Sequence, residues 1–327
     1  MNKEKNYQSL LQLSEQKWDK DTIPLVSISS ITFNHASYIK DCLDGFLMQK
    51  TNFPVEILIH DDASTDGTSD IIKEYQEKYS HLFFPIIQTQ NQYSHGIRGM
   101  SRRFNYPRAR GKYIALCEGD DYWTDPYKLQ KQVDFLEANP EYAGAAHQSR
   151  VMHQNSEKPE SLFRNHIKTV IEMNEVLGDR LFHTASFMFR TEIVQNNTLP
   201  SNITAGDRAL FMLVAAHGKI HYSNEAMCCY RKNDSGISTW VTTELMEKDL
   251  NIVPWIKKIR PDFPKHRYYH FIHYTIMRFP KTITKGKLIN HSCWYIYHSF
   301  YQFPKNIKQV AIFILYELPQ LWLKTKH

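Results

Sequence analysis

The chain has 327 residues, which is enough to bury a large core in one domain that carries an appendage. Apolar residues make up 42% of the sequence and charged residues 23%, so wholesale disorder is excluded. Five cysteines show no metal-ligand spacing, and their odd number argues against a disulfide framework. We therefore expect a cytoplasmic location, where thiols stay reduced.

Charge is distributed unevenly. Residues 251–327 hold 13 Lys and Arg against 2 Asp and Glu, a balance of +11, whereas residues 1–250 hold 27 against 32, a balance of −5. No apolar stretch has the length that spans a bilayer, and the first twenty residues are too polar for a signal peptide. We expect a polar leader at residues 1–22, a main domain at 23–240 and a helical C-terminal extension at 241–327.

Strands and helices alternate from residue 25 to residue 140. Residues rich in β-branched side chains predict strands at 25–32, 55–60, 83–87 and 112–117. Apolar residues at helical spacing predict one helix that contains Ile39 and Phe46 and another that contains Ile72 and Tyr75. Thr124-Asp125-Pro126 is a good helix start. This alternation predicts an α/β fold with a single Rossmann-like, mostly parallel sheet flanked by helices.

Two of the predicted strands end in carboxylates. Asp61 and Asp62 follow the second strand, and Glu118, Gly119, Asp120 and Asp121 follow the fourth. The carboxyl ends of parallel strands meet at one edge of a sheet, where ligands of open α/β sheets bind. Carboxylate oxygens are the ligands of Mg²⁺ and Mn²⁺. The second cluster therefore predicts a divalent-cation site; the alternative is an acidic turn that caps the following helix.

The space between the two acidic strand ends suits a nucleotide. One carboxylate can accept a ring N–H of the base or contact a ribose hydroxyl, while the other cluster holds an ion on the diphosphate. No GxGxxG follows the first strand, and no GxxxxGK[ST] occurs in the chain, so the dinucleotide and P-loop alternatives lack their motifs.

Several motifs, in this order and at this spacing, resemble those of the family 2 glycosyltransferases, nucleotide-sugar-dependent enzymes with the GT-A fold. The resemblance covers roughly residues 24–240. Its motifs are Thr32-Phe33-Asn34 in place of a Thr-Tyr-Asn turn, the segment from Asp61-Asp62 to Gly67-Thr68, Arg102 ahead of the strand entry Ala109-Arg110-Gly111, and Glu118-Gly119-Asp120 with Glu in place of the first Asp of Asp-x-Asp. The resemblance implies that these residues bind the donor: Thr32, Phe33, Asn34, Asp61, Asp62, Arg102, Glu118, Gly119 and Asp120.

Later segments continue the resemblance. Asp207 stands where the family has its catalytic base; the alternative for this residue is a helix N-cap. Residues 183–190 resemble the strand that lines the acceptor site, with a plain core strand as the alternative. Tyr230-Arg231-Lys232 resembles the start of the family's loop that closes over the donor diphosphate, with Asn233 where His is common; the alternative is a solvated loop. Arg231 is expected to stabilise phosphate charge.

The resemblance implies an inverting, metal-dependent transfer of a hexosyl group from a nucleotide sugar, with a UDP-sugar as the usual donor class. Asp120, assisted by Glu118 or Asp121, would hold Mn²⁺ or Mg²⁺, and Asp207 would deprotonate the acceptor hydroxyl. The acceptor would be a glycan or a lipid-linked glycan of bacterial polysaccharide biosynthesis.

Aromatic and basic residues are interleaved in residues 251–327. Such segments favour an anionic bilayer surface, which predicts peripheral association with the inner face of the cell membrane. The alternative is that these helices pack on the main domain and expose their lysines to water. No nucleic-acid-binding motif accompanies the basic residues, so we expect no nucleic-acid partner.

Two other functions stay open. A catalytically degenerate nucleotide-sugar-binding protein of the same fold would explain Glu118 in place of Asp and Asn233 in place of His. A nucleotidyltransferase also uses a carboxylate-held ion, but it would normally carry a loop rich in Gly and Lys or Arg after its first strand. The residues Thr32-Phe33-Asn34-His35 do not form such a loop.

Overall fold

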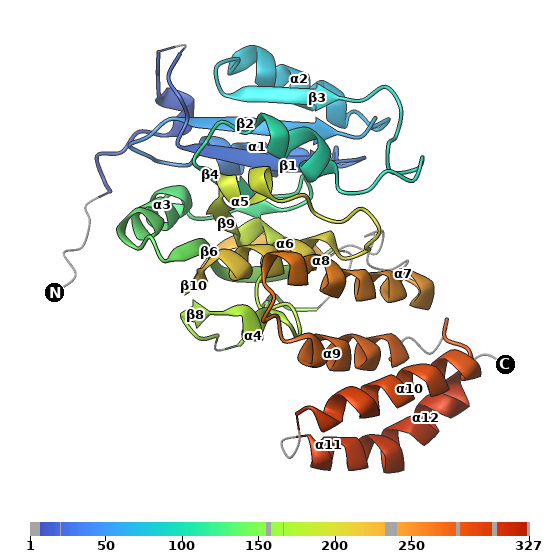
Figure 1. Cartoon of the computed structure of the whole chain (residues 1–327). Coiled ribbons are helices and arrows are strands. Elements are labelled where there is room, and N and C mark those ends of the chain that lie inside the picture. Colours follow the sequence, from blue (N-terminus) through green and yellow to red (C-terminus); the bar gives the residue numbers. More distant parts are fainter. Residues whose placement is uncertain are drawn as a thin grey trace. The chain divides into compact units, whose positions relative to one another are not determined.

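The computed structural model describes residues 7–19, 21–154, 158–165, 167–232, 241–278, 282–302 and 306–325 (Figure 1). The chain forms two compact units. The sheet unit comprises Met1–Glu172, Arg180–Leu199 and His217–Asp234, and the helical unit comprises Met173–Asp179, Pro200–Ala216 and Ser235–His327. The helical unit thus takes in two segments that precede residue 240.

The sheet has the strand order β3-β2-β1-β4-β9-β6-β10-β5. Its first half is formed by β1 (Val26–Thr32), β2 (Val55–Asp61), β3 (Phe83–Ile87) and β4 (Tyr113–Leu116). These four strands pair only in parallel with one another, as the alternating pattern of the sequence predicts. Their carboxyl ends consequently lie at one edge.

The second half of the sheet is mixed. It contains β5 (Tyr122–Trp123), β6 (Tyr142–His153), β9 (Met188–Arg190) and β10 (Lys219–Lys232), with β7 (Ser161–Leu162) and β8 (Val170–Ile171) at its margins. The short strand β9 runs antiparallel to both β4 and β6, and β10 runs parallel to β6 but antiparallel to β5. The α/β sheet flanked by helices is confirmed. The run of parallel neighbours that begins at β3 ends at β4, and β6 and β10 form a further parallel pair beyond β9.

Three helices cover one face of the sheet: α1 (Ile39–Leu47), α2 (Thr68–Lys78) and α3 (Lys128–Ala138). Their buried residues recur at helical spacing and meet alternate residues of the strands, such as Ile28 of β1 and Ile57 of β2. Trp123 is fully buried in this layer, with its ring centroid 4.9 Å from that of Phe46. This core fixes where the strand ends lie.

The other face is covered by a π-helical turn (Ser101–Asn105), a 3-10 turn (Tyr106–Arg108) and α5 (Thr191–Asn196). The buried Asn105 amide donates to Ser29 Oγ at 3.1 Å, to the Ser30 carbonyl at 2.9 Å and to the Leu58 carbonyl at 3.3 Å. One side chain therefore bonds to two neighbouring strands and satisfies polar groups that this face buries.

The N-terminal residues were expected to be a polar leader, but one of them is part of the core of the sheet unit. Leu13, in a 3-10 turn (Leu13–Glu15), is fully buried in the core of the sheet unit. Its N–H donates to the Gln49 carbonyl at 2.8 Å, and the Gln16 amide donates to the Thr51 carbonyl at 2.8 Å. The described residues from 7 to 19 are thus tied to the segment that follows α1.

The helical unit contains α4 (Met173–Val176), α6 (Gly206–His217), α7 (Thr243–Glu247), α8 (Ile252–Ile259), α9 (Lys265–Met277), α10 (Lys285–Phe300), α11 (Ile307–Ile312) and α12 (Leu318–Lys324). A π-helical turn (Phe313–Glu317) joins α11 to α12. Buried histidines line the contact between α9 and α10, where the Nδ1 atoms of His273 and His291 are 2.7 Å apart. Within the described residues, no helix combines the length and the apolar character needed to cross a bilayer.

Candidate active site

Two loops at the carboxyl edge are locked together by hydrogen bonds. The Asn34 N–H donates to Ser64 Oγ at 2.8 Å, and the Asn34 side chain accepts from the Thr65 N–H at 2.9 Å. Both loops use the left-handed region, with φ of 54° at Asn34 and 61° at Ala63. Asn tolerates this conformation better than most residues, so the loop geometry itself favours Asn at position 34.

Asp66 and Thr68 complete this connection. The Asp66 carboxylate accepts the Ala36 N–H at 2.9 Å and the Thr68 hydroxyl at 2.6 Å. Thr68 Oγ1 in turn accepts the His35 N–H at 2.8 Å. The family-like segment after β2 therefore fixes the backbone of the loop after β1.

Asp61 and Asp62 are both buried and hydrogen-bonded within the sheet unit. Asp61 accepts the hydroxyls of Ser64 and Ser69, so it holds the loop that follows it. Asp62 accepts the backbone N–H groups of Gln92 at 2.7 Å and Tyr93 at 3.0 Å. A carboxylate oxygen can accept two hydrogen bonds, so each Asp62 oxygen retains capacity for a ligand donor.

The acidic cluster Glu118, Asp120 and Asp121 lies immediately after β4. One carboxylate oxygen from each of the three residues lies within 4.8 Å of one oxygen from each of the other two. The Gly119 N–H donates to the Ile31 carbonyl at 2.9 Å, which extends the ladder between β1 and β4 into the cluster. The structure therefore brings the predicted metal ligands together, beside the loop after β1.

Gly119 is required by packing. A Cβ at this position would lie 2.6 Å from Thr32 Oγ1 and 2.8 Å from Thr32 Cβ. Thr32 is itself buried, and its hydroxyl has no hydrogen-bond partner among the described residues. The Thr32 hydroxyl thus lies against the cluster with unused hydrogen-bonding capacity.

Asp121 differs from the other two carboxylates. It is 1% exposed, and burial, together with the charges of Asp120 and Glu118, raises its pKa well above the usual value. Its Oδ1 accepts the Arg231 N–H at 2.9 Å, and its Oδ2 lies 3.5 Å from His183 Nδ1. Asp121 is thereby anchored, whereas Glu118 and Asp120 are only half-buried.

Arg231, at the end of β10, lies beside the cluster. Its guanidinium donates to the Asp120 carbonyl at 3.2 Å, pairs with Asp41 and lies 4.4 Å from the Tyr122 ring centroid. The arginine is 8% exposed. Its charge is therefore held next to the acidic cluster, where phosphate charge was expected. Lys232 ends the strand, and Asn233 lies outside the described residues.

Arg102 bonds to backbone carbonyls of the sheet unit. Its guanidinium donates to the Leu199 carbonyl at 2.6 Å and to the Arg98 carbonyl at 3.3 Å, and so ties the π-helical turn to the segment after α5. Tyr106, which the sequence analysis did not identify, lies near Glu118. Burial, followed by the Glu118 charge, raises the pKa of Tyr106, so a neutral phenol adjoins that carboxylate.

His183 was missed as a site residue, and the expected strand at 183–190 is shorter than predicted. A 3-10 turn (Thr184–Ser186) precedes β9, which begins at Met188. The turn is fixed by the Trp123 indole, which donates to the Ala185 carbonyl at 2.8 Å. The His183 ring stacks on Tyr230 with centroids 4.0 Å apart, and burial lowers its pKa well below the usual value. In the sequence, His183 and Tyr230 were noted only as members of family-like segments, and nothing there indicated that their rings stack.

Asp207 belongs to the helical unit. It lies in the first turn of α6, which begins at Gly206, so it does not occupy the N-cap position. The segment before α6 is fixed by the buried Asp249, whose Oδ1 accepts the N–H groups of Thr204 at 2.8 Å and Ala205 at 2.9 Å. Asp207 is half-buried, and its Oδ1 accepts the Arg208 N–H at 2.8 Å.

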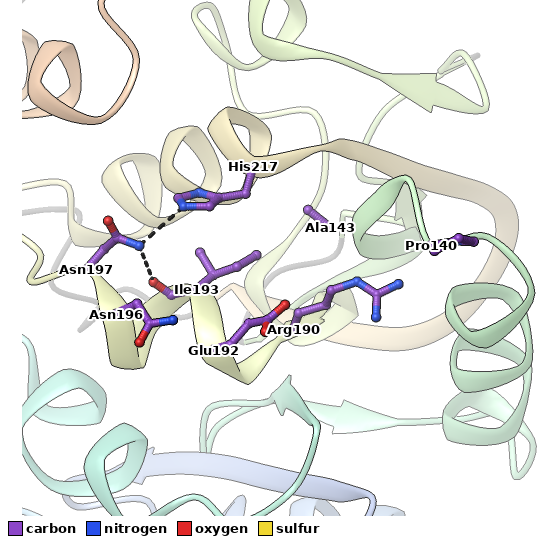
Figure 2. Close-up of a pocket in the computed structure, with 8 residues that line it drawn as sticks. All are labelled: Pro140, Ala143, Arg190, Glu192, Ile193, Asn196, Asn197 and His217. Carbon is purple, nitrogen blue, oxygen red and sulfur yellow. Dashed lines mark hydrogen bonds between the residues drawn. The ribbon is translucent and has the colours of Figure 1, made fainter.

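Two pockets of the sheet unit lie away from the acidic cluster. One, of about 410 Å³, is lined by residues that include Pro140, Ala143, Arg190 and His217 (Figure 2). The other, of about 440 Å³, is lined by residues at the starts of β1 and β4, such as Leu25 and Lys112. These positions are at the amino ends of the strands, opposite the acidic cluster. The site therefore rests on the acidic cluster and its loops, and not on either of these two pockets.

The chain matches known proteins over most of the sheet unit. Residues 27–197 match the family described as Glycosyl transferase family 2. An uncharacterized protein of Mycobacterium tuberculosis is 38% identical over 214 residues, which are 65% of this chain and 60% of that relative. A putative teichuronic acid biosynthesis glycosyltransferase of Bacillus subtilis is 27% identical over 66% of this chain and 82% of its own length.

Solved structures agree with this match. Staphylococcus aureus TarS, crystallised with UDP-GlcNAc, superposes with a TM-score of 0.61 at 18% identity, over 91% of this chain and 87% of the TarS chain. The GT-A fold that the motifs implied is thereby confirmed. Because the family match extends over more than half of the residues, the chain belongs to glycosyl transferase family 2.

Proposed function

We propose that the chain is a metal-dependent, inverting hexosyltransferase that uses a UDP-sugar donor. The acidic cluster Glu118, Asp120 and Asp121, at the carboxyl edge of the parallel strands, carries this proposal. Two relatives support the donor class. TarS was crystallised with UDP-GlcNAc and with UDP, and an Escherichia coli relative, 36% identical over 35% of this chain and 41% of its own length, is named as a UDP-Glc-dependent glucosyltransferase.

The loops beside the cluster supply contacts for a nucleoside. Phe33 is 43% exposed on the loop after β1, and this gives a base a flat apolar surface to stack on. Asp62 keeps acceptor capacity for a ring N–H of the base. Both loops are held by mutual hydrogen bonds, so the donor site is formed before the donor arrives.

The cluster fits a divalent cation. Three carboxylates in so small a volume repel one another, and hard oxygen donors are what Mg²⁺ and Mn²⁺ prefer. Glu118 and Asp120 would hold the ion, while the anchored Asp121 keeps the turn in place. When bound, such an ion neutralises charge on a diphosphate leaving group. Arg231 adds a fixed positive charge beside it.

In this proposal Asp207 is the catalytic base. It accepts the proton of the acceptor hydroxyl as that oxygen bonds to the anomeric carbon and the bond from that carbon to the diphosphate breaks. Attack from the face opposite the leaving group inverts the configuration. Asp249 fixes the backbone before α6 and so orients the turn that carries Asp207.

The acceptor we propose is a hydroxyl of a glycan or a lipid-linked glycan. The Bacillus subtilis relative is named as a putative teichuronic acid biosynthesis glycosyltransferase, which supports this proposal. We place the enzyme in the cytoplasm, peripherally at the inner face of the membrane. The five cysteines are all free, as expected for a reducing compartment.

Thermal unfolding with UDP, GDP or CMP, each with and without Mn²⁺, tests the donor site. A ligand that binds only the native state raises the melting temperature. We expect a Mn²⁺-dependent rise with UDP that disappears in Asp120→Asn and persists in Asp70→Asn, a control whose side chain is 78% exposed on α2. If no nucleotide raises the melting temperature of the wild type, the donor site is refuted.

Hydrolysis and transfer assays separate the enzyme from a binding protein. Asp207→Asn should bind UDP as the wild type does but lose sugar transfer, because the proton acceptor is gone. A wild type that binds UDP-sugars with Mn²⁺ yet releases no UDP, with or without acceptors, would instead be a degenerate binding protein.

A further inference from the structure

The C-terminal helices of the helical unit expose an unusual amount of apolar surface. In the helical segment 307–324, Phe313 is the one buried residue. Leu315, Tyr316 and Leu323 are 66%, 66% and 86% exposed. An apolar helix that buries so little against its own chain leaves a large hydrophobic driving force unused.

Helix α10 adds a second exposed apolar surface. Its residues Leu288, His291 and Tyr295 are buried, whereas Trp294, Tyr297 and Phe300 are 45%, 45% and 69% exposed. The buried residues lie on the side that contacts α9. Trp294 and Tyr297 contact the α9 rings of His273 and His266, with centroids 6.2 Å and 6.4 Å apart, and still leave nearly half of their surface exposed.

The two surfaces belong to one antiparallel pair of helices. Near the start of α10, Lys285 Nζ lies 5.4 Å from the ring centroid of Trp322, near the end of α12. Further along α10, the rings of Tyr295 and Phe313 lie 4.8 Å apart between centroids. We call the exposed side chains of α10 and of residues 307–324 the C-terminal apolar surface.

Charge identifies what covers this surface. Residues 251–327 carry 13 Lys and Arg against 2 Asp and Glu. Of the two acidic residues, Glu317 accepts the Tyr274 hydroxyl at 2.9 Å and Asp262 pairs with Arg260. Two copies of so basic a segment would repel each other, whereas an anionic surface would attract it.

Lysines stand at the ends of the helices, with apolar residues between them. Lys308 lies in the first turn of α11, Lys324 ends α12 and Lys285 begins α10. Trp294, Tyr297 and Trp322 are amphipathic rings of the kind found at the level of lipid headgroups. Long lysine side chains can reach headgroups while neighbouring apolar side chains enter the acyl region.

We propose that the C-terminal apolar surface binds the face of an anionic phospholipid bilayer. The helices lie in the plane of the interface, because none of the described helices can span a bilayer. Leu315, Tyr316 and Leu323 insert between headgroups, and Lys285, Lys308 and Lys324 contact lipid phosphates. The inference specifies the membrane contact of the proposed function, but it rests only on the helical unit and stands if the donor proves not to be UDP.

Vesicle sedimentation with the full chain tests the proposal. Vesicles of phosphatidylglycerol and phosphatidylcholine should retain the wild type at 50 mM salt, retain less at 500 mM, and retain far more than pure phosphatidylcholine vesicles do. The double variant Leu315→Asp/Leu323→Asp should bind at least tenfold more weakly. Its matched control is Leu11→Asp/Leu162→Asp, which changes leucines of the sheet unit that are 55% and 51% exposed.

Three outcomes would overturn the proposal. The first is no retention of the wild type by anionic vesicles at low salt, and the second is equal loss in both double variants. The third is a dimer in analytical ultracentrifugation that Leu315→Asp/Leu323→Asp dissociates, since this would make a second copy the occupant. UDP binding measured on the same variants should not change, so a failure here is distinct from a failure of the donor site.

Discussion

Gly119→Ala is the substitution that most directly tests the geometry of the acidic cluster. The added Cβ would meet Thr32 Oγ1 at 2.6 Å, Thr32 Cβ at 2.8 Å and Ile39 Cδ1 at 3.0 Å. Ile39 can give way through the end of a flexible side chain. Thr32 cannot, because it is the last residue of β1 and is paired with Asp61 of β2. The turn that carries Glu118 and Asp120 must therefore move away.

The cost follows from this packing. Overfilling a well-packed core typically costs about 1–3 kcal/mol, and two contacts below 3 Å on a fixed residue place Gly119→Ala in the upper part of that range. Displacement of two carboxylates should also weaken Mn²⁺-dependent UDP binding by about tenfold, equivalent to about 1.4 kcal/mol.

Chemical denaturation and titration with UDP and Mn²⁺ measure both effects. Gly286→Ala in α10 is the control, because nothing lies within 4 Å of its Cβ position. Thr32→Ala should restore part of the stability of Gly119→Ala, since it removes the closest atom. The reasoning is wrong if Gly119→Ala unfolds and binds UDP as the wild type does, or if Thr32→Ala restores nothing.

Three further changes test packing and protonation. Lys128 is fully buried, and burial lowers its pKa to about 7. Because Lys128 in the unfolded chain stays protonated to about pH 10, the free energy of unfolding should rise by about 2 kcal/mol from pH 7 to pH 9. This rise should vanish in Lys128→Met. Burial, and then neighbouring histidines, lower the pKa of His273 to about 3. The free energy of unfolding should therefore fall as the pH drops from about 6.5 towards 3. Acid titrations should show a less steep fall in His273→Phe than in the wild type. Leu13→Ala should cost about 2–5 kcal/mol in chemical denaturation, against little for the exposed Leu11→Ala, and equal costs would contradict the packing of this segment.

Local pattern predicted the first half of the sheet well. The helix that contains Ile39 and Phe46 was expected from apolar residues at helical spacing, and α1 covers Ile39–Leu47. The strand expected at 25–32 is β1, Val26–Thr32. Helix α1 buries one face, which its apolar spacing records, whereas β1 is buried along nearly its whole length, which suits its richness in β-branched residues. The position of the acidic residues at one edge of the sheet was predicted because they follow strands that the alternating pattern makes parallel.

Residues whose role depends on distant partners were not predicted. Leu13 is a single apolar residue in a polar stretch, and only its contact with the segment after α1 makes it part of the core. His183 and Tyr106 lie beside the acidic cluster because β9 and the turn before β4 pack there, which no local spacing encodes. The motif identified Arg102, but only the fold shows that its guanidinium also donates to the backbone carbonyls of Leu199 and Arg98.

The substitution of Glu for Asp at position 118 bears on whether the cluster can function. One extra methylene would move the carboxylate out of reach of an ion if the backbone were held as in an Asp-x-Asp turn. The Glu118 carboxylate nevertheless offers an oxygen within 4.8 Å of those of Asp120 and Asp121. The Gly119 N–H donates to the Ile31 carbonyl at 2.9 Å, and this hydrogen bond fixes the backbone of the turn. The added methylene is therefore accommodated by the Glu118 side chain and not by a shift of the backbone. The departure from the family motif thus preserves three oxygen donors, and the case for a degenerate binding protein cannot rest on Glu118.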